Sequence, residues 1–245
     1  FYRHPVSVPD FKPTKHTDGP NIIFIGLDTL RADALRLYNP GAQAKTPNLE
    51  AFARDAVLFQ RAFAQACWTK PSFATFFTGL YPESHRATSK SAALPLEVTT
   101  IAEWLRDAGY YTQGFGNNPN TSTHFQFDQG FVQYYDLRPR LHFGASWSAS
   151  KSALYEILRR VRQIFIDKIH PGRIYVEDFY QPAEVVNQYA FGWLDSSARP
   201  QHSPFYLFLH YMDPHDPYMN WSRPGIGYAH IQMARPNPET HLEPM

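Results

Sequence analysis

The sequence predicts an α/β fold with a mostly parallel β-sheet that helices flank on both faces. Two short apolar runs, residues 21–27 and 204–209, have the length and continuity of strands buried on both faces. A further strand is expected at residues 110–115, between segments with helical spacing. This β–α–β alternation is typical of a parallel sheet with covering helices.

Composition indicates a globular chain without a strong bias toward one class of partner. The 245 residues are 43% hydrophobic and 18% charged, with a net charge of +1. This charge gives no reason to expect nucleic-acid binding. The sequence has one cysteine, which excludes an internal disulfide framework. It contains no run of 18 apolar residues, so no transmembrane segment is predicted.

The elements follow from local signals along the chain. Residues 1–20 are expected to be an irregular lead-in, and residues 21–245 one α/β domain. Thr46 and Pro47 are typical of a helix start, and Thr100 with Glu103 fits a capping box for a helix that stops at Gly109. Residues 120–150 show no clear period, and residues 120–175 are interpreted as an insertion or lid. A last helix should begin at residues 182–184.

Residues 152–169 form a predicted helix with apolar side chains at helical spacing and three arginines around them. A basic amphipathic helix of this kind can lie on a membrane surface. More often such a helix packs its apolar face against the domain and leaves its charges in water. The sequence leaves both interpretations open.

Residues 65–82 form the stretch around which the chain is organised. Pro71 is expected at the first position of a helix, and Gly79 just past its end. Thr69 would then lie immediately before the helix N-terminus, where unpaired N–H groups and the helix dipole favour an anion. A hydroxyl there either caps the helix or attacks a sulfur or phosphorus centre whose oxygens the helix end holds.

Three segments resemble, in the same order, motifs of the sulfatase family in the alkaline phosphatase superfamily. They are residues 21–33, then Pro71 and Ser72 with residues 78–82 and His85, and finally residues 210–218. They span most of residues 20–220. The resemblance implies a fold of the alkaline phosphatase type. It also implies a chain that is incomplete at the C-terminus, because the family's later Asp-His or Asp-Asn metal motif does not occur before Met245.

The resemblance assigns roles to particular residues. Asp28 would bind a divalent metal ion, and Thr69 would be both a metal ligand and the nucleophile. His215 would contact the substrate and protonate the leaving group, with His210 in the nearby substrate-contacting shell. Lys70 would either steady the anion or be a solvated surface lysine.

The sequence also departs from the family pattern. Thr29 stands where a second aspartate is usual, and Phe73 replaces the arginine that follows Pro-Ser. Asn117 occupies the position of a lysine that contacts the ester group, so we expect it to contact the substrate, and Pro119 lies near a histidine position. These changes weaken the case for sulfate-specific chemistry.

The nucleophile position holds Thr69 in place of the cysteine that sulfatases oxidise to formylglycine. Cys67 is out of register, so no formylglycine is expected, and we interpret Cys67 as a small packing residue. A threonine can attack if its hydroxyl is activated, as in related phosphoethanolamine and lipoteichoic-acid transferases. Threonine lacks the second hydroxyl by which formylglycine expels sulfate, so phosphoester chemistry is the easier step.

The resulting prediction is a metal-dependent hydrolase or transferase for sulfate or phosphate esters of a small molecule, a glycan or a lipid headgroup. The sequence does not distinguish Ca, Mg, Mn or Zn. Asp28 and Thr69 are too few to hold the metal tightly, so we expect a fragment that is inactive alone. The alternative is a degenerate, non-catalytic binding domain. Many relatives act outside the cytoplasm, which points to a periplasmic or extracellular location.

Overall fold

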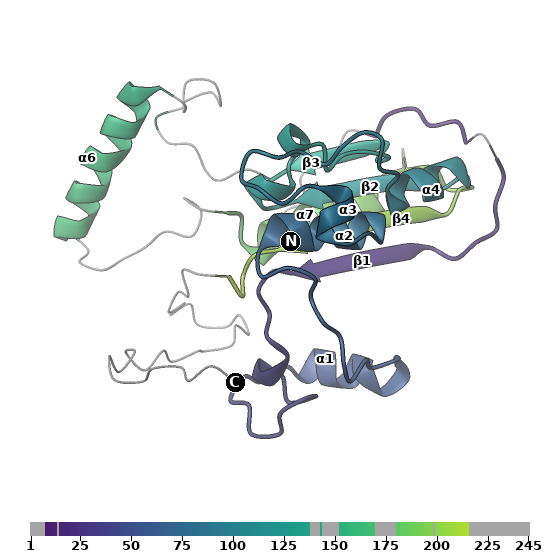
Figure 1. Ribbon diagram of the computed structural model, residues 1–245, viewed down its shortest axis with the longest axis horizontal. Helices are drawn as coiled ribbons and strands as arrows, with labels where there is room; N and C mark the ends of the chain where they lie inside the picture. The colour runs from purple at the N-terminus through teal and green to yellow at the C-terminus, as the bar shows by residue number, and fades with distance from the viewer. Residues whose placement is uncertain are drawn as a thin grey trace. The chain divides into compact units, whose positions relative to one another are not determined.

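The computed structural model describes residues 8–13, 15–137, 143, 152–169, 180–197 and 199–215. The chain divides into two compact units. One comprises Phe1–Asp28 and Ala64–Asp213, and the other comprises Thr29–Phe63 and Pro214–Met245. The sheet and the candidate site both lie in the first unit (Figure 1).

Within the described residues, the first unit contains a four-stranded parallel sheet with the strand order β1-β4-β2-β3. The strands are β1 (Ile22–Leu27), β2 (Tyr111–Gly116), β3 (Gln133–Asp136) and β4 (Phe205–Tyr211). The parallel sheet of the sequence prediction is thus confirmed. Because Gly26 pairs with His210, the carboxyl ends of β1 and β4 lie side by side although they are far apart in sequence.

The helices of the first unit are α2 (Thr69–Thr78), α3 (Pro82–His85), α4 (Ile101–Asp107), α6 (Ala153–Ile169) and α7 (Ala183–Leu194). Two short 3₁₀ turns, Pro119–Thr121 and Thr123–Phe125, follow β2. The second unit contains α1 (Pro47–Phe52) with 3₁₀ turns at Ala32–Ala34 and Ala53–Asp55.

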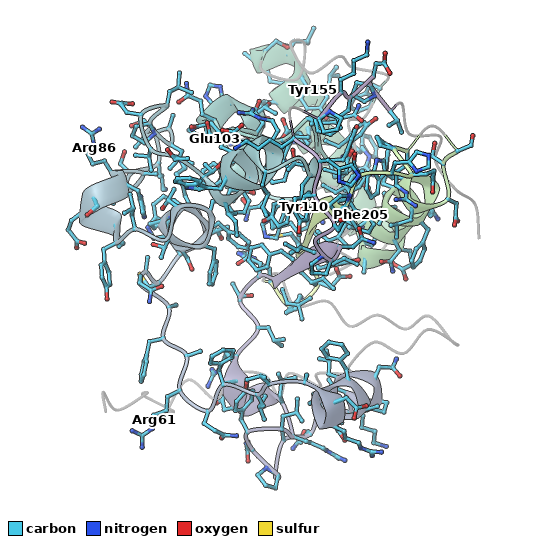
Figure 2. The ribbon with its side chains drawn as sticks, turned by 90° about the vertical axis from the view of Figure 1, so that its right-hand side faces the viewer. Arg61, Arg86, Glu103, Tyr110, Tyr155 and Phe205 are labelled. Atoms are coloured by element: carbon cyan, nitrogen blue, oxygen red, sulfur yellow. The ribbon has the colours of Figure 1, made fainter. Side chains whose placement is uncertain are left out.

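Two hydrophobic clusters lie on opposite faces of the sheet because successive side chains of a strand point to opposite faces. Tyr206 and Phe208 of β4 pack with residues of α2 and α4. Phe205, Leu207 and Leu209 of the same strand pack with α7. Figure 2 labels Tyr110 from the first cluster and Phe205 from the second. The prediction of helices on both faces is confirmed, and the β4 strand that carries His210 is buried between them.

The prediction that the first strand is buried on both faces is wrong. Ile23, Ile25 and Leu27 are 51%, 52% and 37% exposed. In the described sheet β1 is an edge strand. The cluster around α7 contains side chains of β2 and β4 and none of these three. An apolar run therefore indicates a strand, but only its neighbours decide whether both faces are covered.

Several predicted boundaries are confirmed and others shift. Gly79 ends α2 with a positive φ of 69°, and its N–H donates to the Thr75 carbonyl at 2.8 Å. The capping box of Thr100 and Glu103 is present. Helix α2, however, begins at Thr69, so Pro71 is its third residue. The first turn of a helix has no intrahelical acceptors for its N–H groups, so proline is tolerated there as well.

Strand β3 was not expected, because residues 120–150 were interpreted as part of an insertion or lid. It is only four residues long and includes the polar Gln133 and Asp136. Hydrogen bonds just before β3 support its pairing with β2. Thr112 Oγ1 of β2 donates to the Gly130 carbonyl at 2.7 Å and accepts the Val132 N–H at 2.9 Å. A short polar strand of this kind leaves little signal in sequence periodicity.

The buried His85 predicts a pH effect on stability. Its Nδ1 accepts the Ala87 N–H at 3.1 Å, and its Nε2 lies 3.3 Å from Thr75 Oγ1. Burial lowers the pKa of His85 below the ordinary 6.5, against smaller raising effects of the Pro71 carbonyl and Glu83. The unfolded chain therefore takes up the proton first, and His85 costs stability as the pH falls below about 6.5.

Urea unfolding at neutral and mildly acidic pH measures this effect. We expect His85→Gln to lose less stability on acidification than the unchanged protein. His124→Gln, which removes an exposed histidine, serves as the matched control and should behave like the unchanged protein. An identical pH dependence for both variants would contradict the prediction.

Candidate active site

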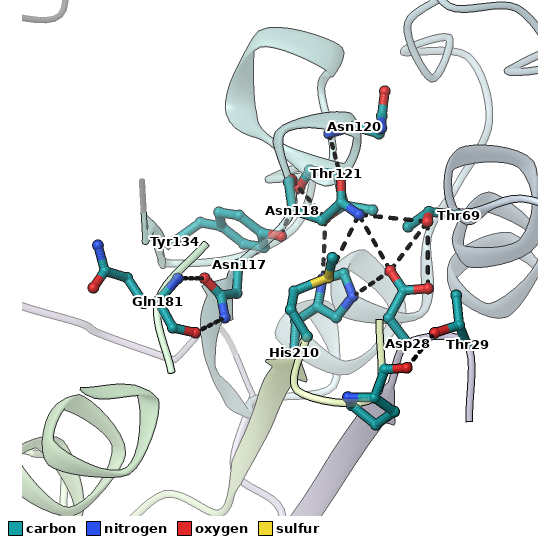
Figure 3. Close-up of polar contacts among 12 residues, drawn as sticks. Asp28, Thr29, Thr69, Asn117, Asn118, Asn120, Thr121, Tyr134, Gln181 and His210 are labelled. Atoms are coloured by element: carbon teal, nitrogen blue, oxygen red, sulfur yellow. Dashed lines mark hydrogen bonds and ion pairs between the residues drawn. The ribbon is translucent and has the colours of Figure 1, made fainter. Parts of the chain in front are cut away.

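Asp28 and Thr69 meet at the carboxyl edge of the sheet. Asp28 directly follows β1, and Thr69 is the first residue of α2. The Thr69 hydroxyl donates to the Asp28 carboxylate, with distances of 3.0 Å to Oδ2 and 3.3 Å to Oδ1 (Figure 3). Both side chains are buried, at 6% and 9% exposure. The hydroxyl thus has a proton acceptor already in contact, which is the arrangement of a nucleophile with its base.

His210 holds the Asp28 carboxylate from the other side. It comes from β4, is fully buried, and places Nε2 3.2 Å from Asp28 Oδ2. An ionised carboxylate only accepts hydrogen bonds, so Nε2 is the donor. The Nδ1 atom lies 3.3 Å from Thr121 Oγ1. His210 therefore lies behind Asp28, and its expected contact with a substrate stays a prediction.

Asn118 is a member of this cluster that the sequence analysis did not identify. Its Nδ2 donates to Asp28 Oδ2 at 3.2 Å and lies 3.4 Å from Thr69 Oγ1. The Asn120 N–H donates to Asn118 Oδ1 at 2.9 Å, which fixes which end of the amide faces the site. Thr69 therefore donates to Asp28 and accepts from Asn118. Its position in the sequence could have indicated this role, because Asn118 follows the end of β2 by two residues and β2 pairs with β4.

Lys70 follows Thr69 in sequence but points elsewhere. It is fully buried, and its Nζ donates to the carbonyl oxygens of Ser89, Lys90 and Ala92 at 3.1, 2.7 and 3.0 Å. The ammonium group also lies 3.2 Å from the centre of the Phe125 ring, a cation–π contact. Burial lowers the pKa of Lys70. These contacts contradict a solvated surface lysine, and they also occupy the three donors that a bound anion would need.

Asn117 is likewise engaged by the backbone. Its Nδ2 donates to the Gln181 carbonyl at 2.7 Å, and its Oδ1 accepts the Gln181 N–H at 2.9 Å. Figure 3 shows this pair apart from the contacts around Asp28. With 1% exposure, Asn117 joins the end of β2 to the segment before α7. The expected substrate contact through this side chain therefore has no support in the described geometry.

Phe73, which departs from the family pattern, and Cys67 differ in their burial. Phe73 packs in the core, with its ring centre 4.4 Å from that of His210. A Cβ on Gly26 would approach Phe73 Cε1 to 2.7 Å, so only glycine lets α2 pack this closely on β1. Cys67 is exposed, which contradicts its interpretation as a packing residue.

The second unit holds Thr29, which departs from the family pattern, and the predicted site residue His215. Thr29 has a φ of 56°, a strained value for a β-branched residue, and its hydroxyl donates to the Pro214 carbonyl at 3.0 Å. His215 also belongs to this unit, and its role as acid or substrate contact stays a prediction.

The donors around Asp28 do not by themselves fit a divalent metal ion. Within the described residues, no group of three or more His, Cys, Asp or Glu side chains could hold one. The cluster offers one carboxylate and one hydroxyl, whereas such ions take several oxygen ligands. Asn118 Nδ2 and His210 Nε2 contact the same carboxylate and add no further oxygen ligand. The two predicted ligands are brought together, but they make an incomplete site.

Comparison with known proteins places this chain in a family. The Sulfatase family model matches residues 20–230. The chain is 25% identical to iduronate 2-sulfatase of Mus musculus over 211 residues, which cover 82% of this chain and 36% of the relative. It is 22% identical over 203 residues to an uncharacterised sulfatase, YidJ, of Escherichia coli strain K12, covering 81% of this chain and 39% of that protein.

Solved structures share the fold. The phosphonate monoester hydrolase of Agrobacterium radiobacter matches with a TM-score of 0.56 and 24% identity, over 81% of this chain and 42% of that chain. The chain therefore spans 36–42% of the length of these three proteins. Since the family model covers most of the sequence, the chain belongs to the Sulfatase family.

Proposed function

We propose that this chain carries the nucleophile side of an ester hydrolase for sulfuric or phosphoric esters, with Thr69 as the nucleophile. The observation that carries this proposal is the hydrogen bond from the Thr69 hydroxyl to Asp28, at 3.0 Å to Oδ2. His210 and Asn118 hold that carboxylate in turn, so the nucleophile, its base and the groups that orient the base are all in contact. A residue that only capped α2 would instead bond to the helix backbone.

The reaction would proceed in two steps. Thr69 Oγ attacks the sulfur or phosphorus centre, its proton passes to the Asp28 carboxylate, and the bond from that centre to the leaving-group oxygen breaks. The leaving oxygen takes up a proton, for which His215 is the predicted donor. Water then attacks the sulfur or phosphorus centre of the threonine ester, the bond from that centre to Thr69 Oγ breaks, and Oγ takes back the proton held by Asp28. This step releases inorganic sulfate or phosphate. The positive end of the α2 dipole favours the charge on the transferring group.

A sulfate ester of a sugar is the first substrate to try. Relatives are named iduronate 2-sulfatase and N-acetylglucosamine-6-O-sulfatase, and the latter is 28% identical over 132 residues. The chemistry of a threonine ester, which lacks the second hydroxyl of formylglycine, keeps phosphoesters as the second class. Small molecules and lipid headgroups remain further candidates for the ester.

Members of this family generally use a divalent metal ion. Asp28 and Thr69 stay the proposed ligands in this chain, and they need further ligands from outside the described residues. Bound there, the ion would supply positive charge next to the reacting oxygen. Assays with added Ca, Mg, Mn or Zn and with a chelator test this. Activity that persists in chelator would overturn the ligand assignment and leave Asp28 as the base alone.

The function is tested on the native gene product. Aryl sulfate, aryl phosphate monoester and aryl phosphate diester are supplied in separate incubations with divalent metal, and intact mass is followed for a covalent adduct. We expect turnover of at least one ester and an adduct that peptide mapping places on Thr69. Absence of both turnover and adduct for every ester, including sulfated sugars, would favour the non-catalytic binding domain.

Asn118 provides a separate prediction. Its amide contacts both the nucleophile and the base, so Asn118→Leu should lower kcat about 10–100-fold, the range found for groups that orient catalytic residues. KM should change little, because the Asn118 amide contacts Asp28 and the Thr69 hydroxyl, which are groups of the protein. The matched control is Asn120→Ala on the same 3₁₀ turn, since it keeps the backbone N–H that Asn118 accepts. A rise in KM with an unchanged kcat would mean that Asn118 binds substrate instead.

A further inference from the structure

Helix α6 carries an exposed apolar face. Its start is set by Ser152, whose Oγ accepts the Tyr155 N–H at 3.2 Å. Six apolar side chains recur at helical spacing and are between 41% and 66% exposed: Leu154, Ile157, Leu158, Val161, Ile164 and Phe165. At 3.6 residues per turn they fall within an arc of roughly 120°. Tyr155, labelled in Figure 2, lies off this arc and is buried.

Basic residues border this apolar face. By the same helical geometry, Arg160 and Arg162 lie beyond its two edges. Arg159 lies on the far side, where its guanidinium pairs with the Glu156 carboxylate at 3.0 Å. The helix contains four basic and two acidic residues, whereas the whole chain has a net charge of only +1. Positive charge is thus concentrated next to exposed apolar surface.

We propose that the apolar face of α6 binds the surface of an anionic lipid membrane. A helix of this kind lies in the interfacial plane, with its apolar face at the boundary between headgroups and acyl chains. The flanking arginines would then reach lipid phosphates, for which the guanidinium fork is well suited. None of the helices that the structure describes is long and apolar enough to cross a membrane.

Charge favours a membrane over a second copy of this helix. Two α6 helices joined through their apolar faces would bring Arg160 and Arg162 of one copy toward those of the other, and like charges repel. An anionic lipid surface attracts the same side chains. The six described side chains of this apolar face are 41–66% exposed, so they are available to a membrane surface.

Vesicle flotation of the native gene product tests the proposal. Vesicles of phosphatidylcholine alone are compared with vesicles that also contain phosphatidylglycerol, at low and high salt. We expect binding to the anionic vesicles that weakens with salt. Each basic residue strengthens such binding about five-fold, so the double variant R160E/R162E should lower the partition coefficient at least about 25-fold. Val161→Asp should abolish binding, because it places a charge in the centre of the apolar face.

Matched variants separate this face from general surface effects. Val57→Asp makes the same substitution at a valine that is 82% exposed elsewhere, and R61E/R86E reverses two exposed arginines (Figure 2). Both should bind like the unchanged protein. Equal binding to neutral vesicles, or equal losses in the controls, would overturn the proposal. A dimer that Val161→Asp dissociates, without vesicle binding, would identify a second copy as the occupant instead.

Discussion

Thr69→Ala in the native gene product is expected to lower kcat/KM for the cleaved ester by at least about 10⁴-fold, as removal of a covalent nucleophile does. The hydroxyl is the group that donates to the Asp28 carboxylate, at 3.0 Å to Oδ2 and 3.3 Å to Oδ1. The covalent adduct should disappear together with turnover. Steady-state kinetics and intact mass on the same samples give both results.

Two further variants separate chemistry from packing. Thr69→Val keeps the shape of the side chain without its hydroxyl, and it should be as inactive as Thr69→Ala. Thr69→Ser keeps the hydroxyl and should retain activity within about ten-fold, because the nucleophile is preserved. Unfolding curves for all three establish that the sheet is intact. An inactive Thr69→Ser together with an active Thr69→Val would show that shape matters here and that the hydroxyl does not.

Lys70→Ala is expected to lower the free energy of unfolding by about 4 kcal/mol, since it removes a buried stem and leaves three carbonyl groups without their donor. Those carbonyls belong to Ser89, Lys90 and Ala92, so the loop that they form should loosen as well. Lys70→Met keeps most of the stem and loses only the donors, so its expected cost is smaller, about 2 kcal/mol. Urea unfolding of the two variants measures the difference.

The same variants decide whether Lys70 acts on the substrate. In the described geometry its ammonium group faces the loop, so KM for the ester should stay unchanged in Lys70→Met while stability falls. Lys90→Met is the control, because it alters an exposed side chain and keeps the backbone carbonyl that Lys70 contacts. If KM rises strongly and stability does not change, Lys70 contacts the anion as the sequence first indicated.

The sequence predicted most of the elements because their signals are local. Continuous apolar runs indicated β1 and β4, and the Thr100–Glu103 capping box indicated the start of α4. Glycine at a position of positive φ marked the end of α2. Each signal depends on a few neighbouring residues and needs no knowledge of the rest of the chain. Strand β3 lacked such a signal and was missed.

The candidate site could be predicted only where position along a strand was enough. Asp28 and His210 were expected at one sheet edge because each ends an apolar run, and they do make contact. Asn118 was missed, because an asparagine after a strand is common and only its contacts with Asp28 and Thr69 distinguish it. Asn117 was chosen by its position in a motif and Lys70 as the neighbour of Thr69 in sequence, and neither criterion says where a side chain points.

By itself, the sequence determined the strands and most helices, the sulfatase-like order of motifs, and the pairing of Asp28 with Thr69 as candidate chemistry. Only the tertiary structure decided that His210 lies behind Asp28, that Lys70 and Asn117 bond to backbone groups, and that the apolar face of α6 is exposed. The physical reason is how far apart in sequence the interacting residues lie. Helix caps and apolar periodicity involve residues close in sequence, whereas these contacts depend on how separate segments meet.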